Sequence, residues 1–357
     1  MKRNPKHLFI PEETPATFQY DVSLTRLEPG TLATWIERED GKEHICCAAL
    51  TGGQLQDIQR IEPWQGVPRR PKSDGKTIVW SEYEEQKGTL CHVDRGTDIA
   101  ACPISAASHL DTGDIALCRN TRDTTWLLAE QRSGPLRLLK HDSRGWTEQP
   151  FSERSGVFAT HPTLCETSAG LLTAWSEYAN GAYHIRSRLV ADDNQRDVGI
   201  LPAPANTWET LPALAVSTTG IPFCARCRER LVELPGSAAN YHTELVVAVM
   251  HDNHWHDVAG VNVDHALNPW MAAYWGFRRH PRLVTDEDSV WLLWEEKLDS
   301  TSMDPALGRL CAISVTEAGK NGDPIVLLSD KNQMVAESGA VAPTLRIATK
   351  TQPHGFM

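Results

Sequence analysis

The feature that most constrains how this chain can fold is a tryptophan followed two residues later by a glutamate, which recurs along most of the sequence. The clearest copies each end a short apolar run, and they are Trp35-Ile-Glu37, Trp80-Ser-Glu82, Trp175-Ser-Glu177 and Trp294-Glu-Glu296. Two more runs align with these if Leu128 and Cys224 take the tryptophan position. The six positions are then 45, 48, 47, 49 and 70 residues apart. Repeats of this length indicate a chain made from copies of one supersecondary unit.

Each copy of the repeat has the pattern of three or four short β-strands. An X-Pro pair such as His161-Pro162 or Leu211-Pro212 precedes the first apolar run. We expect the proline to begin that strand, because it lacks the N–H that a ladder would need. A β-branched, partly alternating run such as residues 183–188 follows the Trp-x-Glu segment and predicts a third strand. One such unit cannot bury both of its faces, so copies must stack on one another.

These features predict an all-β fold, a single β-propeller domain over residues 1–357, with tryptophan rings packed between neighbouring sheets. We expect six full blades and a partial seventh. The repeat places them at 17–65, 68–104, 105–151, 156–205, 208–262 and 278–330, with the partial blade at 342–357. Six-bladed and seven-bladed forms both stay open, because the first 13 residues could supply closing strands. An open β-solenoid is the alternative, which the long, tryptophan-rich units disfavour.

Composition excludes several classes of partner. No run among the 357 residues has the apolar length of a membrane span, and apolar and charged residues make up 41% and 23% of the chain. The net charge of −11 argues against binding of nucleic acid or of an anionic lipid surface. We expect a monomer without a nucleic-acid or membrane partner, in which an anionic ligand would need a local group of arginine or histidine.

The cysteines and the first residues bear on the compartment and on metals. Most of the nine cysteines lie in apolar runs, as buried thiols do in a reducing compartment. Residues 1–11 have no secretory pattern, so we expect a cytoplasmic protein, or a periplasmic or secreted one whose signal is missing. The sequence requires no cofactor, and a structural zinc or calcium ion stays open. Cys224-Ala-Arg-Cys227 has a zinc-like spacing without a second pair, which favours packing.

The 70-residue step points to the functional region, because it contains two insertions between residues 228 and 277. The second insertion includes Tyr274 and Trp275, rings that could form a wall for sugar rings, although a surface loop folded on its own tryptophans is an equal alternative. Arginines gather around the same insertions, among them Arg226 and Arg279. Guanidinium groups bind carboxylate or sulfate by paired hydrogen bonds, so this group fits an anionic glycan, with ordinary surface ion pairs as the alternative.

Histidines recur at corresponding places in different units. His161 and His280 both precede a proline, while His184 and His242 both follow a tyrosine where a third strand begins. If these positions face one end of a propeller, their imidazoles could act as acid or base near neutral pH. A structural role is the alternative for each of them.

The pairing of His161-Pro-Thr-Leu with Trp175-Ser-Glu177 and Tyr183-His184 resembles the propeller repeat of the sialidase-like superfamily, and within it the polysaccharide lyases of the ulvan lyase type. Those lyases have two histidines in one blade, at a spacing similar to the 23 residues between His161 and His184. The resemblance implies β-elimination across a uronic acid of an acidic polysaccharide or oligosaccharide. It implies the following roles: acid and base from His161, His184 and Tyr241; carboxylate binding by Arg226 and Arg279; and His280 in reserve. The order of Arg226 before Tyr241 departs from the family.

Two other functions stay open. A sialidase-like glycoside hydrolase would share the fold, but its Ser-x-Asp-x-Gly-x-Thr-Trp turns survive only in degraded form at 141–146 and 251–255. Its paired carboxylates are also not evident, because the glutamates after the tryptophan positions recur from unit to unit as structural residues do. A non-catalytic propeller that binds glycans or proteins is the third reading, since the fold hosts many functions.

Overall fold

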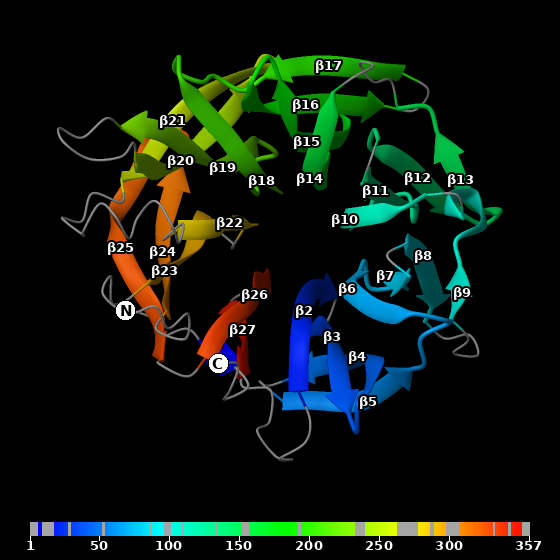
Figure 1. Ribbon diagram of the computed structural model, residues 1–357. Coiled ribbons are helices and arrows are strands. Elements are labelled where there is room, and N and C mark those ends of the chain that lie inside the picture. Colours follow the sequence, from blue (N-terminus) through cyan, green and yellow to red (C-terminus); the bar gives the residue numbers. More distant parts are fainter. Residues whose placement is uncertain are drawn as a thin grey trace. The chain divides into compact units, whose positions relative to one another are not determined.

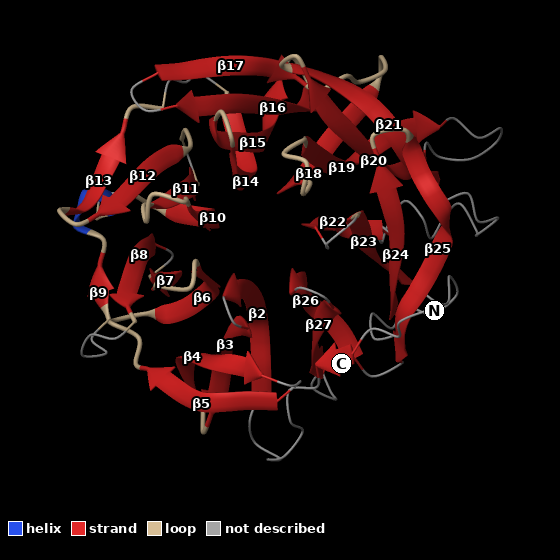
Figure 2. Cartoon of the chain, turned by 180° about the vertical axis from the view of Figure 1, so that it is seen from behind, coloured by secondary structure: helices blue, strands red, loops and turns tan. Residues whose placement is uncertain are grey.

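The computed structural model describes most of the chain as β-strands (Figure 2). The described ranges are 6–8, 18–27, 30–51, 54–85, 87–95, 101–108, 110–132, 134–151, 157–191, 194–232, 240–262, 278–285, 289–297, 308–330, 333–341 and 344–351. The chain divides into two compact units, and each is described by itself. Unit 1 comprises Met1–Ser155 and Met334–Met357, and unit 2 comprises Gly156–Gln333. No helix among the described residues is long and apolar enough to cross a membrane.

Unit 1 begins with three four-stranded antiparallel sheets, which we number blades 1–3 in chain order (Figure 1). Blade 1 consists of β2 (Phe18–Leu27), β3 (Gly30–Glu39), β4 (Lys42–Thr51) and β5 (Gln54–Ile61). Blade 2 consists of β6 (Val67–Ser73), β7 (Thr77–Glu84), β8 (Lys87–Asp94) and β9 (Cys102–Pro103). Blade 3 consists of β10 (Thr112–Arg119), β11 (Thr125–Gln131), β12 (Arg137–Asp142) and β13 (Gly145–Gln149), and the short 3-10 helix η1 (Ser105–Ala107) precedes it.

The two ends of the chain meet in a three-stranded sheet. Its order is β1 (Lys6–Leu8), β27 (Thr344–Thr351) and β26 (Gln333–Val341), and β1 pairs with β27 in parallel. This sheet is the partial seventh blade that the sequence predicts. It is larger than the single strand we expected after Ala342, because β26 precedes β27 and the amino-terminal segment adds β1.

Unit 2 contains three more four-stranded antiparallel sheets, blades 4–6. Blade 4 consists of β14 (Phe158–Thr167), β15 (Gly170–Ala179), β16 (Ala182–Ala191) and β17 (Asn194–Ile200). Blade 5 consists of β18 (Thr207–Val216), β19 (Pro222–Val232), β20 (Asn240–His251) and β21 (His254–Asn262). Blade 6 consists of β22 (Arg278–Thr285), β23 (Val290–Lys297), β24 (Gly308–Thr316) and β25 (Gly319–Asp330). Within the unit the first strands β14, β18 and β22 follow one another, each in contact with the next (Figure 1).

A bulge interrupts the first strand of each blade, and the X-Pro pairs lie in it. In β14 the register shifts between Thr160 and Thr163, which places His161-Pro162 in the bulge and not at the strand start as we expected. Two bulge residues oppose one residue of the next strand, so the missing N–H of proline removes no ladder hydrogen bond. His161 has φ 52°, and Arg70 and Leu211 have φ 53° and 54° at the corresponding places. This unusual backbone therefore belongs to the blade architecture and not to one functional residue.

In each blade, one residue of the second strand stands opposite the bulge, and this is the position at which the tryptophan recurs. It is Trp35, Trp80, Trp175 and Trp294 in four blades. In β11 and β19 the same position holds Glu130 and Arg226. Our alignment placed Leu128 and Cys224 there, two residues too early, because a shift of two residues along a strand keeps the same face and so preserves the apolar pattern.

Neighbouring blades of a unit share one core. In unit 1, Trp80 of blade 2 packs with Leu32 and Ile45 of blade 1. In unit 2, Trp294 of blade 6 packs with Phe223 and Val247 of blade 5. Each of these side chains is almost completely buried, and burying a large apolar side chain contributes about 1.5–3 kcal/mol relative to exposure. Stacking therefore supplies the core that a single sheet lacks.

Glu82 shows what the repeated glutamate does. Its carboxylate accepts hydrogen bonds from the backbone N–H groups of Trp64, Gln65 and Gly66 at 2.7, 2.8 and 2.9 Å, and from Trp80 Nε1 at 2.7 Å. These amides belong to the segment that joins β5 to β6. The side chain is buried and holds two blades together, which agrees with a structural role for the recurring glutamate.

Candidate functional site

The candidate site is built on blade 4, where two of the predicted catalytic residues lie in one sheet. β15 pairs with β14 on one side and with β16 on the other. Glu177 of β15 stands opposite both Ala159 of β14 and His184 of β16. Residues that are directly opposite in a sheet share a face, so Glu177 and His184 project to the same side.

The bulge brings His161 to that same face. Thr160 stands opposite Ser176 and Thr163 stands opposite Ala174, so His161 and Pro162 together oppose Trp175. Trp175 and Glu177 are two residues apart and therefore share a face. The fold thus places both predicted acid/base histidines on one face of one sheet, flanking β15 near its end, as the 23-residue spacing suggested.

The same face carries two arginines that sequence reasoning missed. Arg186 stands opposite Trp175, and its Nε forms an ion pair with Glu177 Oε2 at 2.8 Å. Arg188 places its guanidinium over the Trp175 ring, 5.6 Å from the centroid. The signal was present as His184-x-Arg186-x-Arg188, because a period of two in a strand puts all three side chains on one side. The face therefore combines imidazole, carboxylate and guanidinium groups.

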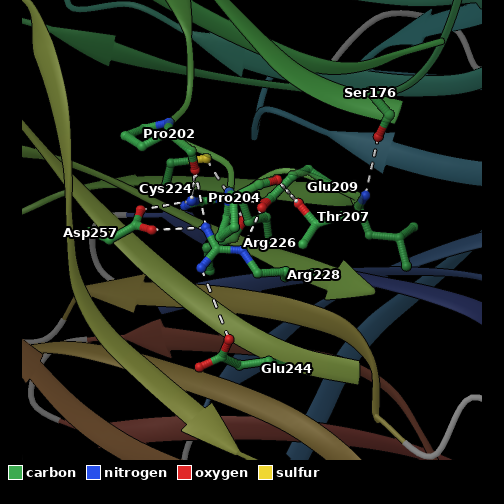
Figure 3. Close-up of polar contacts among 12 residues, drawn as sticks. Ser176, Pro202, Pro204, Thr207, Glu209, Cys224, Arg226, Arg228, Glu244 and Asp257 are labelled. Atoms are coloured by element: carbon green, nitrogen blue, oxygen red, sulfur yellow. Dashed lines mark hydrogen bonds and ion pairs between the residues drawn. The ribbon is translucent and has the colours of Figure 1, made fainter. Parts of the chain in front are cut away.

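Arg226 has a different role from the one we predicted. Its guanidinium is 0% exposed and forms an ion pair with Glu209 Oε2, which is also fully buried. Its Nη2 donates to Asp257 Oδ1 at 2.7 Å and to the Pro202 carbonyl at 2.7 Å, as Figure 3 shows. A guanidinium enclosed in this way has no surface on which a polysaccharide carboxylate could bind. The assignment of Arg226 as a carboxylate-binding residue is therefore withdrawn.

Arg228 completes this network. It donates to Glu209 Oε1 at 2.5 Å, to Asp257 Oδ2 at 2.8 Å and to the Pro202 carbonyl at 3.0 Å (Figure 3). Burial raises the pKa of the Glu209 carboxyl, and the positive charges of Arg226 and Arg228 oppose that shift. Pro202 lies between β17 and β18, so the two arginines hold the linker between blades 4 and 5 by donating to a carbonyl. Glu82 holds the linker before blade 2 in the opposite sense, by accepting from amides.

For the other predicted residues the structure gives at most the position of the backbone. Tyr241 lies on β20 opposite Leu231, and Arg279 lies on β22 opposite Glu295. His280 falls in the bulge of β22, the counterpart of the His161 position. The side chains of these three are outside the described part of the structure, as are Tyr274 and Trp275 altogether. Their roles stay predictions.

A second polar cluster, which sequence reasoning did not identify, lies between blades 2 and 3 of unit 1. Cys102 Sγ is 3.5 Å from His92 Nε2, and the His92 and His141 rings are 5.8 Å apart. His141 stacks on Trp146 with centroids 4.7 Å apart and places Nε2 3.9 Å from Asp94 Oδ2. Burial raises the pKa of the Cys102 thiol, so it is protonated and a poor nucleophile. In the described part of the chain, no three His, Cys, Asp or Glu residues are placed to hold a metal ion.

This cluster predicts a pH dependence of stability. Burial lowers the pKa of His92 from 6.5 to about 4. Between these pH values an unfolded chain protonates this residue while the folded protein does not, so His92 stabilises the fold fully above pH 6.5 and loses that contribution as the pH falls toward 4. We expect a loss on the order of 3 kcal/mol, measured by urea unfolding across this pH range.

Two variants separate His92 from the other histidines. His92→Phe should remove this part of the pH dependence, whereas replacing the exposed His254 by Asn should leave it unchanged. An equally steep loss of stability in His92→Phe would contradict the prediction.

Comparisons with known proteins support the fold. No family model matches the chain, and no curated protein matches it. An ulvan lyase, a polysaccharide lyase solved bound to -[GlcA(1-4)Rha3S]-, is 12% identical over 94% of this chain and 88% of its own, with a TM-score of 0.55. The β-propeller domain of the Trilobed protease from Pyrococcus furiosus is 10% identical over 95% of this chain and 100% of its own, with a TM-score of 0.51. Kuenenia stuttgartiensis hydrazine synthase is 10% identical over 92% of each chain, with a TM-score of 0.52.

At these identities the similarities show the fold alone. The predicted all-β propeller with six full blades and a partial seventh is confirmed by the seven sheets of the described chain and by these structures. The resemblance to propeller lyases that the sequence suggested is likewise matched by a structural similarity to an ulvan lyase.

Proposed function

We propose that this propeller is a polysaccharide lyase that cleaves an acidic, uronic-acid-containing glycan by β-elimination. The observation that carries the proposal is the position of His161 and His184 on one face of blade 4, on either side of β15. The structural similarity to an ulvan lyase supports it at the level of the fold, which by itself hosts many functions.

The chemistry assigns each group a task. One histidine, in its neutral form, removes the C5 proton of a uronic acid, and the C5–H electron pair becomes the C4=C5 double bond. The C4–O bond breaks, and a second group, His184 or Tyr241, donates a proton to the leaving oxygen. A cation beside the C5 carboxylate makes the C5 proton more acidic. With Arg226 enclosed in its own network, Arg279 is the remaining carboxylate binder of our prediction.

Hydrolysis by a pair of carboxylates fits this face less well. Glu177 is the carboxylate that the register places beside His184, and it is buried in an ion pair with Arg186. A glycosidase needs a second carboxyl group at a suitable distance across the scissile bond. Asp197 of β17 is a second carboxylate on blade 4, but Arg186 holds it as well, with Nη1 2.6 Å from its Oδ2, so both carboxylates are engaged by one guanidinium.

Elimination has a direct optical signature. Incubation of the protein with a panel of uronic-acid polysaccharides should raise the near-ultraviolet absorbance, because the new C4=C5 bond is conjugated with the carboxylate. Neutral polysaccharides, which have no C5 carboxylate, serve as the control and should give a flat trace. Release of reducing ends without any rise in absorbance would replace elimination by hydrolysis.

A further inference from the structure

Aromatic side chains gather at one end of unit 2, beside the histidine-bearing end of blade 4. The rings of Tyr178 and Tyr183 have centroids 4.9 Å apart and are tilted by 54°. Trp208 of blade 5 meets Tyr183 edge-on, with centroids 6.2 Å apart and an angle of 70°. Phe158 stands opposite Tyr178 in the sheet. Tyr178 is 41% exposed and Phe158 is 39% exposed, so two large rings are exposed at opposite positions of one sheet.

The register relates these rings to the candidate site. Tyr178 stands opposite Tyr183, one step further along the sheet than the pair of Glu177 and His184. Successive residues of a strand point to opposite faces, so the tyrosines lie on one side of blade 4 and His184 on the other. Both pairs are next to the turn between β15 and β16. A long ligand that crosses this end of the sheet can therefore contact both.

A cationic side chain lies at the same end of blade 5. Arg230 stands opposite Thr207 and is exposed, on the other face of blade 5 from Trp208, which stands opposite Glu229. It lies on the same face of β19 as Arg228 and Arg226, two and four residues earlier. Exposed guanidinium groups bind carboxylates by paired hydrogen bonds.

We propose that Tyr178, Tyr183 and Trp208 form a subsite that binds a pyranose ring of an acidic glycan, with Arg230 as the cation at the same end of the sheet that binds a carboxylate further along the glycan chain. The apolar C–H face of a pyranose is attracted to the electron-rich face of an aromatic ring, and its equatorial hydroxyl groups stay in water. The rings are tilted against one another, so they offer single stacking faces and not the broad apolar area that a protein interface of about 800 Å² per partner requires. The inference rests on the proposed function for the substrate class.

The test measures glycan binding apart from turnover. Oligogalacturonate and oligoglucuronan tetrasaccharides are titrated into the full-length protein by calorimetry, and KM and kcat are measured on the parent polysaccharides. Tyr178→Ala and Trp208→Ala should each raise Kd and KM about five- to tenfold, the effect of losing one stacking contact, with kcat and Tm unchanged. Tyr178→Phe keeps the ring and should bind as the wild type does. Trp64→Ala, which removes a ring that is 42% exposed in unit 1, is the matched control and should have no effect.

The outcomes distinguish this subsite from the lyase proposal. If the wild-type protein binds the tetrasaccharides without an absorbance change, and Tyr178→Ala and Trp208→Ala weaken that binding, the subsite is supported and the lyase proposal is contradicted. If the protein catalyses elimination and both variants keep the wild-type Kd and KM, the subsite proposal is contradicted and the lyase proposal is supported. A wild-type protein that binds none of the tetrasaccharides at millimolar concentration overturns the subsite.

Discussion

Arg226→Ala is expected to lower the free energy of unfolding by about 3–5 kcal/mol, the largest effect on stability that we predict. The substitution removes the partner of Glu209, which is fully buried, and leaves that carboxylate with Arg228 alone. It also removes one of the two donors that hold the Pro202 carbonyl between blades 4 and 5. Urea unfolding followed by circular dichroism, with hydrogen exchange of blade 5 amides, measures the loss.

Two further variants test whether the loss of stability comes from the buried ion pair. Arg230→Ala changes an exposed arginine of the same strand and should shift the stability by less than about 0.5 kcal/mol. The double variant Arg226→Met with Glu209→Leu replaces a buried ion pair by apolar groups and should regain most of the loss, because neither charge of the pair is then left buried alone and Arg228 keeps Asp257 as its partner. An Arg226→Ala protein as stable as the wild type would show that the pair is not enclosed in solution.

His184→Ala is expected to reduce kcat for elimination by about 10²–10⁴-fold while Tm stays within a few degrees of the wild type. The imidazole is lost from the face that His161, Glu177 and Arg186 share, and with it one route for proton transfer. Initial rates from the absorbance of the unsaturated product, together with thermal unfolding, measure both quantities. Turnover that survives His184→Ala would assign the acid/base role to another residue.

Blade 1 supplies a matched control for this experiment. His44 stands opposite Glu37 in β3 and β4, as His184 stands opposite Glu177 in β15 and β16. His44→Ala therefore removes an imidazole from the same register position of a different blade, and it should leave kcat unchanged. If both variants lose stability to the same extent and only the folded fraction accounts for the lost activity, the histidine at this position is structural.

Only part of the candidate site could be read from the sequence. The spacing of His161 and His184 placed both residues in one blade, because strand lengths and tight turns are local properties. The role of Arg226 could not be read in the same way. Its strand is buried on both faces from residue 222 to residue 227, and an alignment shifted by two residues keeps the same faces and fits the sequence equally well. The bulge of β18 removes the ambiguity, because it places Arg226 where other blades have tryptophan.

The sequence by itself determined the fold class, because each blade is a local unit whose strands and recurring tryptophan lie within about 50 consecutive residues. The tertiary structure alone decided the contacts between distant segments. These are the pairing of β1 with β27 across the length of the chain, the enclosure of Arg226 by Glu209, Asp257 and Pro202, and the meeting of Trp208 with Tyr183. Each joins segments that are far apart in the sequence, and the packing of such segments leaves no periodic pattern in the chain.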